Sequence, residues 1–378
     1  MKKICVFTGK RGGFGAMYPL LQMIHNEPSM TLVLVAGDMH LNPLFGETLH
    51  EVQNLIEVNY VVDMGAYGGA FVDRGKALAR CIDGLLDVLD EEKPDVLLLL
   101  GDRGETVAAA FAAVEMGVPV AHIQAGDISG GLDDIHRHAI TKLSHLHFAQ
   151  NESQRQRVIG LGEYPDRVWN TGAPYIDTLL DVPRESKAAT LKALDVEDKR
   201  YIILLFHPDT YCPEKAGAQM QEIIEAIKQD GRTCICIYPC SDPGYEQIIA
   251  ALEQLRGNPQ FVIKKNVEFK VFVNLLFHAD LLIGNSSAGI IEAPYFKLPF
   301  VLVGNRQNGR DHCLNVIQVE ADTEQILRAM NEAEDSWFRE KLEQIGYPFG
   351  KGQACKKIFE VLQKTVFDMN LFRKRITF

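Results

Sequence analysis

The chain has 378 residues and a net charge of −11, with 47% hydrophobic and 24% charged residues. This length suggests about two domains, and the composition is that of an ordinary globular protein. The negative charge argues against a nucleic-acid partner, because binding a phosphate backbone requires a basic face.

Neither a membrane span nor a targeting segment is predicted. No stretch approaches the ~20 apolar residues that a spanning helix needs. The N-terminal run KICVFTG leads into a glycine-rich loop and not into a small-residue cleavage site. Eight cysteines are spread along the chain, several of them in apolar runs, as expected of a reduced protein. We therefore expect a cytoplasmic protein with no membrane partner.

The chain opens with KICVFTGKRGGFG (3–15), followed by the helical pattern AMYPLLQMI. This predicts a strand, a glycine-rich loop and a helix, an arrangement whose backbone N–H groups can bind an anion. Glycines at 9, 12, 13 and 15 match neither the dinucleotide fingerprint nor the P-loop. Two interpretations remain for this loop, an anion site of another kind or a tight turn with a surface Lys and Arg.

Apolar runs then alternate with helical patterns such as 105–117, which predicts parallel sheets covered on both faces. A polar stretch, 180–200, interrupts this alternation and predicts a domain boundary. The strand-like runs before it are 31–37, 95–101, 118–123 and 145–150, and those after it are 201–206, 233–238, 260–265, 279–285 and 298–304. Helical patterns over 321–345 and 352–368 close the chain. The predicted class is α/β, with two doubly wound parallel-sheet halves.

Polar residues follow five of the predicted strands. Parallel strands end at one edge of a sheet, and ligands bind there, so two facing halves predict a site in the cleft between them. The residues in these loops include Asp102, Arg103, Asp127, Asp134, Arg137, His207, Ser286, Ser287, Glu292 and Arg306.

The run NSSAGIIEA indicates a nucleotide site. Ser286 and Ser287 stand where a helix is predicted to begin, which suits a phosphate, and Glu292 suits a ribose diol. Taken alone, the serines are better explained as an ordinary helix N-cap, but Arg306 on the loop after the next strand shifts the balance towards a phosphate.

Three carboxylates, Asp102, Asp127 and Asp134, are candidates for acid and base roles, because clustered carboxylates shift one another's pKa values. A helix dipole alone would explain acids at a helix start, but not those at neighbouring strand ends. Cys234, Cys236 and Cys240 could hold a metal, yet no second ligand pair follows, so buried cysteines are favoured.

Four motifs carry a family resemblance. GDRGE, AHIQAGDISGGLDDIHRHAITKLSHLHF, FHPDT and GNSSAGIIEAPYFKLPFVLVGNRQNGR resemble the hydrolysing UDP-N-acetylglucosamine 2-epimerases, which open sialic and related nonulosonic acid synthesis. The resemblance runs from Lys3 to about Ile326. It implies a GT-B-like fold of two Rossmann-like domains, 1–180 and 181–351, with the final helix (about 352–378) packed back on the first. It also implies no cofactor, no metal, and a homodimer or homotetramer.

The resemblance assigns roles by motif. Carboxylates that act on the sugar are expected at Asp102, Asp127 and Asp134, with His207 as a further catalytic candidate. Residues expected to contact the UDP-sugar are Arg11, His40, Arg103, Arg137, His207, Ser286, Ser287, Glu292 and Arg306. The anion for the first loop would then be the UDP-sugar, reached by Arg11.

Several positions depart from the family pattern, among them Ala125 for a glycine, Asp127 for a glutamate and Cys240 for an asparagine. They fall in the expected sugar pocket and leave open a related substrate such as UDP-diacetylbacillosamine. Three alternatives to a hydrolysing epimerase are a non-hydrolysing epimerase, a retaining glycosyltransferase and a catalytically silent UDP-sugar-binding regulator.

Overall fold

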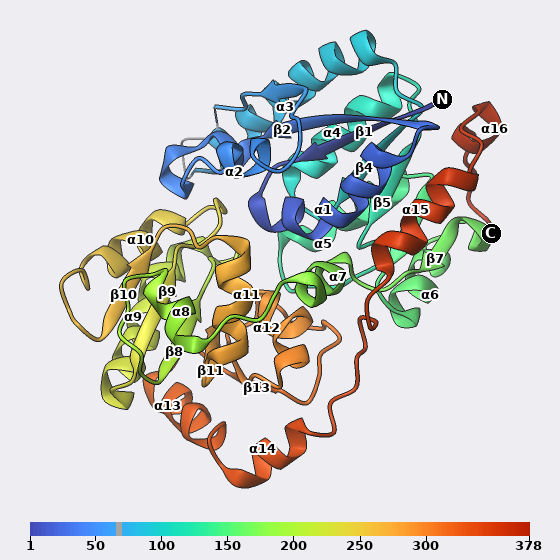
Figure 1. Cartoon of the computed structure of the whole chain (residues 1–378). Coiled ribbons are helices and arrows are strands. Elements are labelled where there is room, and N and C mark those ends of the chain that lie inside the picture. Colours follow the sequence, from blue (N-terminus) through green and yellow to red (C-terminus); the bar gives the residue numbers. More distant parts are fainter. Residues whose placement is uncertain (66–69) are drawn as a thin grey trace. The chain divides into compact units, whose positions relative to one another are not determined.

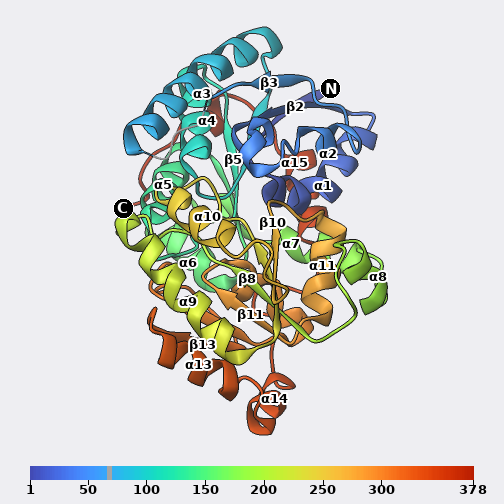
Figure 2. The same ribbon diagram turned by 90° about the vertical axis from the view of Figure 1, so that its left-hand side faces the viewer.

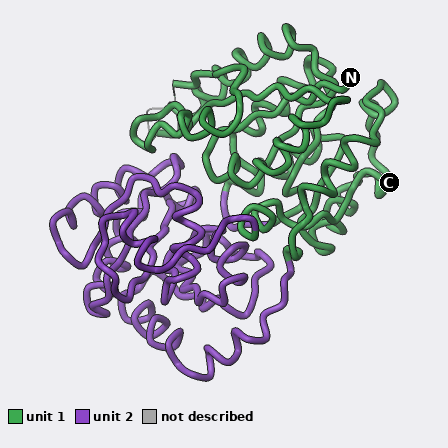
Figure 3. The backbone as a smooth tube through the Cα atoms, in the orientation of Figure 1, with its two compact units in different colours: residues 1–127, 132–180, 349–378 green, residues 128–131, 181–348 purple. Residues whose placement is uncertain are grey.

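The computed structural model describes residues 1–65 and 70–378, which form two α/β units (Figures 1 and 3). Unit 1 comprises Met1–Asp127, Leu132–Leu180 and Phe349–Phe378, and unit 2 comprises Ile128–Gly131 and Asp181–Pro348. Each unit contains one parallel sheet with helices packed against it. The α/β class with two doubly wound sheets is thereby confirmed.

The sheet of unit 1 has seven strands in the order β3-β2-β1-β4-β5-β6-β7. This order reverses direction at β1, which pairs in parallel with both β2 and β4. The strands are β1 (Lys2–Thr8), β2 (Met30–Gly37), β3 (Tyr60–Val62), β4 (Val96–Leu100), β5 (Val120–Ile123), β6 (Leu146–Ala149) and β7 (Val168–Asn170).

Both faces of this sheet are buried, because successive side chains of a strand point to opposite faces. Cys5 and Phe7 of β1 lie in the core with helices α3 and α4, whereas Ile4 and Val6 lie in the core with α1 and α15. The helices of unit 1 are α1 (Arg11–Asn26), α2 (Leu49–Gln53), α3 (Phe71–Glu92), α4 (Gly104–Glu115), α5 (Leu132–Leu143), α6 (Glu152–Gly160), α7 (Pro174–Asp181), α15 (Ala354–Lys364) and α16 (Met369–Phe372).

The C-terminal helix α15 belongs to unit 1. Asp177 of α7 accepts hydrogen bonds from the backbone N–H groups of Ala354 and Cys355 at 3.0 and 2.7 Å. A carboxylate at a helix N-terminus satisfies donors that have no partner inside the helix. This contact fixes the start of α15, whose apolar side chains then pack against α1.

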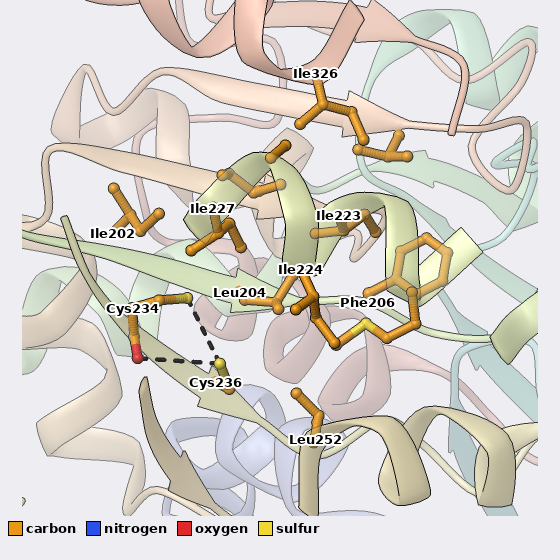
Figure 4. Close-up of a cluster of buried hydrophobic side chains, with 14 of the residues drawn as sticks. Ile202, Leu204, Phe206, Ile223, Ile224, Ile227, Cys234, Cys236, Leu252 and Ile326 are labelled. Carbon is orange, nitrogen blue, oxygen red and sulfur yellow. Dashed lines mark hydrogen bonds between the residues drawn. The ribbon is translucent and has the colours of Figure 1, made fainter. Parts of the chain in front are cut away.

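Unit 2 has six strands in the order β10-β9-β8-β11-β12-β13. Its main core lies between the sheet and α9, α10 and α13 (Figures 2 and 4). The strands are β8 (Tyr201–Leu205), β9 (Thr233–Ile237), β10 (Phe261–Lys264), β11 (Leu281–Gly284), β12 (Phe300–Val303) and β13 (Val316–Val319). The helices are α8 (Lys187–Lys192), α9 (Ala216–Asp230), α10 (Tyr245–Glu253), α11 (Phe269–His278), α12 (Ala288–Ile291), α13 (Thr323–Glu332) and α14 (Ser336–Leu342).

Some elements differ from the sequence prediction. The edge strands β3 and β7 and the strand β13 were not predicted, because runs of three or four residues carry little periodicity. The pattern over 321–345 is two helices, α13 and α14, and not one. In the described ranges, no helix is long and apolar enough to cross a membrane.

Candidate functional site

The first loop is shorter than the sequence predicted. Helix α1 begins at Arg11, directly after Gly9 and Lys10, so Gly12, Gly13 and Gly15 lie inside its first turns. A Cβ atom added at Gly12 would meet no other atom within 4 Å. The backbone N–H groups of this first turn have no partner within the helix, as is general for helix N-termini. Arg11 Nη1 lies 3.6 Å from Glu51 Oε2.

The predicted carboxylates of unit 1 are brought together by one buried arginine. Arg137 of α5 is fully buried, and its guanidinium bonds Asp102 after β4 and Asp134 in the first turn of α5. The same guanidinium donates to the backbone oxygen of Asp127 at 3.0 Å. Asp102 and Asp134 keep 15% and 22% of their side chains exposed. A single cation therefore sets the positions of two partly accessible carboxylates.

Electrostatics keeps this cluster charged. Burial lowers the pKa of Arg137, but the carboxylates of Asp102, Asp127 and Asp134 raise it by more, so its pKa lies above the usual value.

His122 of β5 is a buried neighbour of this cluster, with Nε2 2.7 Å from the backbone oxygen of Gly101. Burial lowers the pKa of His122 to about 3, so its ring is neutral at physiological pH.

A second group of four charges lies nearby in unit 1, at the ends of β2 and β4. Arg103 donates from Nε to Glu105 at 2.8 Å and lies 3.8 Å from Asp38. Arg74 of α3 pairs with the same two carboxylates, at 2.8 Å to Asp38. We call Asp38, Arg74, Arg103 and Glu105 the buried quartet.

The two carboxylates of the buried quartet fix the position of the Arg103 guanidinium. Burial, followed by the charge of Glu105, raises the pKa of Asp38 to about 6. Burial alone would raise the pKa of Glu105, but Arg103 and Arg74 lower it to about 2. A Cβ at Gly9 would lie 2.9 Å from Glu105, so the first loop packs directly on this carboxylate. Removal of one member would leave a buried charge without its partner, so we expect any single substitution in the quartet to lower the stability of the fold strongly.

His40, which the resemblance predicts to contact the UDP-sugar, lies between two threonines. It is fully buried, with Nε2 3.1 Å from Thr8 Oγ1 and Nδ1 2.8 Å from Thr48 Oγ1. Burial, aided by Arg11, lowers its pKa to about 4. Both ring nitrogens lie within hydrogen-bond distance of threonine hydroxyls, so the ring helps to hold the loop after β2. Its contact with the UDP-sugar stays a prediction.

In unit 2, the site histidine is fixed by neutral hydrogen bonds. The amide of Asn285, after β11, accepts from His207 N at 2.7 Å and donates to His207 O at 2.8 Å. The backbone N–H of Cys240 donates to His207 Nδ1 at 3.0 Å. An imidazole nitrogen that accepts a hydrogen bond carries no proton, so the neutral ring bears its proton on Nε2. His207 therefore presents a hydrogen-bond donor.

The loop after β11 is built around close backbone contacts. Gly284 has φ +136°, and a Cβ there would come within 2.1 Å of Leu205 O, so only glycine fits. Ser286 is buried and Ser287 is partly exposed. The helix that follows, α12, is a single turn ending at Ile291, with Glu292 at its C-cap. A helix does begin after the serines, as predicted, but it is short, since a 3₁₀ turn follows from Ala293.

Arg306 lies in the loop after β12. Its Nη2 is 3.3 Å from Asp242 Oδ2, which also accepts from the thiol of Cys240 at 2.9 Å. Its backbone oxygen accepts from Gly130 N at 2.9 Å, and a Cβ at Gly130 would overlap Asn305 O at 2.0 Å. The loop that carries Arg306 is therefore held at both its side chain and its backbone.

Two of the three clustered cysteines lie in an apolar core. Cys234 and Cys236 are fully buried in the core of unit 2, with their sulfurs 3.5 Å apart (Figure 4). Across residues 1–65 and 70–378, no group of three or more metal-ligating side chains occurs.

Sequence reasoning missed several supporting residues. Asn285, which positions His207, opens the run NSSAGIIEA but was assigned no role of its own, and Asp242, which lies beside Arg306, belongs to none of the motifs. Asp38 directly follows β2, which could have marked it, and Glu105 lies in the first turn of α4, within the motif GDRGE. Arg74 lies inside α3 and gives no local signal.

Comparison with known proteins adds independent findings. The model of the UDP-N-acetylglucosamine 2-epimerase family matches residues 22–363. A UDP-N,N'-diacetylbacillosamine 2-epimerase (hydrolyzing) of Legionella pneumophila is 32% identical, covering 99% of both chains. A UDP-N-acetylglucosamine 2-epimerase of Neisseria meningitidis serogroup B is 32% identical over 88% of both chains. A crystal structure of a Neisseria meningitidis UDP-GlcNAc 2-epimerase bound to UDP-GlcNAc has a TM-score of 0.78 at 23% identity, covering 97% of this chain and 100% of that one.

Proposed function

The chain belongs to the UDP-N-acetylglucosamine 2-epimerase family, and from this premise we propose that it is a hydrolysing UDP-HexNAc 2-epimerase. Its substrates would be water and UDP-N-acetylglucosamine, or a close relative such as UDP-diacetylbacillosamine. Its products would be UDP and the free 2-epimeric sugar, which is N-acetylmannosamine for the first substrate. This reaction would supply the hexosamine precursor of a sialic or related nonulosonic acid.

The observation that carries the proposal is the cluster of Asp102 and Asp134 around Arg137, with Asp127 on the same guanidinium through its backbone. Inverting a carbon that bears a hydrogen requires removal and return of a proton, and positioned carboxylates supply that chemistry. The weakly acidic C2 proton leaves only if charge on the departing group is stabilised at the same time. The fixed cluster meets the first requirement.

Residues of unit 2 would stabilise the charge on the departing UDP. His207 would donate from Nε2 to a phosphate oxygen, and Arg306 would balance the charge of the diphosphate. The hydroxyls of Ser286 and Ser287 would add neutral donors, and Glu292 would accept from the ribose. With UDP stabilised as a leaving group, loss of the C2 proton gives a glycal.

Hydration completes the proposed reaction. Water adds its hydroxyl to C1 of the glycal, and a carboxylic acid returns a proton to C2 from the opposite face. The C1–O bond to UDP breaks in the first stage, so one water is consumed for each UDP released. No electron transfer occurs, and no nicotinamide is needed.

A non-hydrolysing epimerase is the second candidate, because several relatives are named UDP-N-acetylglucosamine 2-epimerase without further specification. The sequence GDRGE and the segment DDIHRHAITKLSH favour the hydrolysing reaction, by resemblance.

Incubation with UDP-N-acetylglucosamine and, separately, with UDP-diacetylbacillosamine tests the proposal. A time course followed by mass spectrometry should show free sugar and UDP rising together in equal amounts. Accumulation of an epimeric UDP-sugar instead would contradict the hydrolysing reaction. Release of UDP only on addition of an acceptor would indicate a glycosyltransferase.

A further inference from the structure

Unit 1 contains a pocket that the proposed reaction does not use. It has a volume of about 530 Å³ and lies between the C-terminal end of α5 and the last segment of the chain. That segment follows α15, forms the short helix α16 and runs on to the C-terminus, where Thr377 N donates to Gly162 O at 3.3 Å (Figure 1). Pockets of this size hold small organic ligands.

The pocket is lined by cations in a chain that is acidic overall. Its lining includes Lys142, Arg373, Lys374 and Arg375, and none of the lining residues is acidic. Lys142 and Lys374 are engaged, since both pair with the buried carboxylate of Glu163. Arg373 and Arg375 are exposed, and in the described part of the chain neither guanidinium has a hydrogen bond or ion pair.

An uncharged pair of rings, His145 and Phe372, forms another part of the lining. The rings of His145 and Phe372 stack with centroids 4.9 Å apart and an interplanar angle of 19°. His145 Nδ1 accepts from Val120 N, and Nε2 lies 3.1 Å from Phe372 O, the pattern of a neutral ring. Two guanidiniums beside neutral rings favour an anion, and arginine forks suit phosphate oxygens.

The pocket is connected to the carboxylate cluster through one helix. Lys374 Nζ donates to the backbone oxygens of Thr141 and Lys142 at 2.9 Å, so it caps the C-terminal end of α5. The first turn and middle of the same helix carry Asp134 and Arg137. A ligand that moves the segment around Lys374 would therefore act on the end of the helix that positions two residues of the candidate site.

From these observations we propose that the pocket is an effector site for a small phosphate-bearing anion, held by Arg373 and Arg375. Binding there alters turnover through α5. The binding claim is independent of the proposed function, and only the turnover readout rests on it.

The probe for the test is inorganic pyrophosphate, titrated by calorimetry into the protein in the presence of saturating UDP. Wild type should bind pyrophosphate, and the charge-reversed variant Arg373→Glu/Arg375→Glu should bind at least ~10-fold more weakly, because two charge-assisted contacts become repulsive. The milder Arg373→Gln/Arg375→Gln variant should lie between the two. Arg328→Glu reverses an exposed charge on α13 of unit 2 and is the matched control.

The outcomes separate the claims. Absence of binding to wild type at millimolar concentration, or equal binding to the charge-reversed variant, would overturn the site. A pyrophosphate effect on turnover that is present in wild type and in Arg328→Glu, but absent in Arg373→Glu/Arg375→Glu, would support the effector role. An effect of the same size in all three proteins would overturn that role.

Discussion

The two units build their candidate sites from different materials. Unit 1 buries formal charges, with Arg137 among carboxylates and the buried quartet beside them. Unit 2 holds His207 through an asparagine side chain and a backbone N–H, which are neutral groups. Desolvating charges is costly, and such pairs often contribute little net stability, so fixed charge in unit 1 is better explained by chemistry than by folding. In the proposed function, this difference corresponds to unit 1 moving protons and unit 2 binding the nucleotide.

The largest expected effect is on turnover, when the aspartates of unit 1 are substituted. Asp102→Asn, Asp127→Asn and Asp134→Asn should each lower kcat by about 10²–10⁴-fold, the usual contribution of an acid or base. UDP affinity should stay nearly unchanged in all three. Steady-state kinetics and calorimetry measure the two quantities, and near-native kcat in one variant would remove that residue from the catalytic set.

The converse experiment concerns unit 2. Arg306→Ala or Glu292→Ala should weaken UDP binding by about 10–100-fold, since a hydrogen bond to a charged group contributes roughly 1.5–3 kcal/mol. The ratio of products should not change. Calorimetry with UDP gives the affinity, and Arg328→Ala on the exposed face of α13 is a matched control. Native affinity in both variants would show that the nucleotide is bound elsewhere.

The buried histidines of unit 1 predict a smaller, pH-dependent effect on stability. Burial is the largest cause that lowers the pKa to about 4 for His40, His145 and His147 and to about 3 for His122. The unfolded chain, with histidine pKa values near the usual ~6.5, binds more protons than the folded chain below that pH. The free energy of unfolding should therefore fall as the pH drops from about 6.5 towards 4.

Urea denaturation at a series of pH values measures this dependence. His147→Gln should reduce the slope between pH 6.5 and 4, because the variant no longer has that ring to protonate on unfolding. A free energy of unfolding that stays constant over this window would contradict neutral buried histidines.

Removal of metal ions is expected to have no effect on activity. Activity should survive EDTA without added metal, since the proposed proton transfers use carboxylates and the leaving group is stabilised by arginine and histidine. Loss of turnover on chelation, restored by a divalent metal, would overturn the metal-free mechanism.

The sequence was sufficient for the fold class and for the grouping of Asp102, Asp134 and Arg137. Strand ends in a parallel sheet lie at one edge, so polar residues that follow strands converge whatever their separation along the chain. It could not give Arg74, because a residue in the first turn of α3 meets Asp38 and Glu105 only through packing. It also gave no sign of the two threonine partners of His40, because Thr8 and Thr48 become its neighbours only in the folded state.

Turnover in D2O containing H2-18O tests the central claim most directly. Proton removal by a carboxylate, which exchanges with solvent, should place one deuterium at C2 of the released sugar. Hydration of the glycal should place 18O at C1 of the sugar and none on UDP. A sugar that keeps its original C2 proton, or 18O found on the phosphate, would contradict elimination and hydration and indicate a phosphohydrolase or transferase reaction.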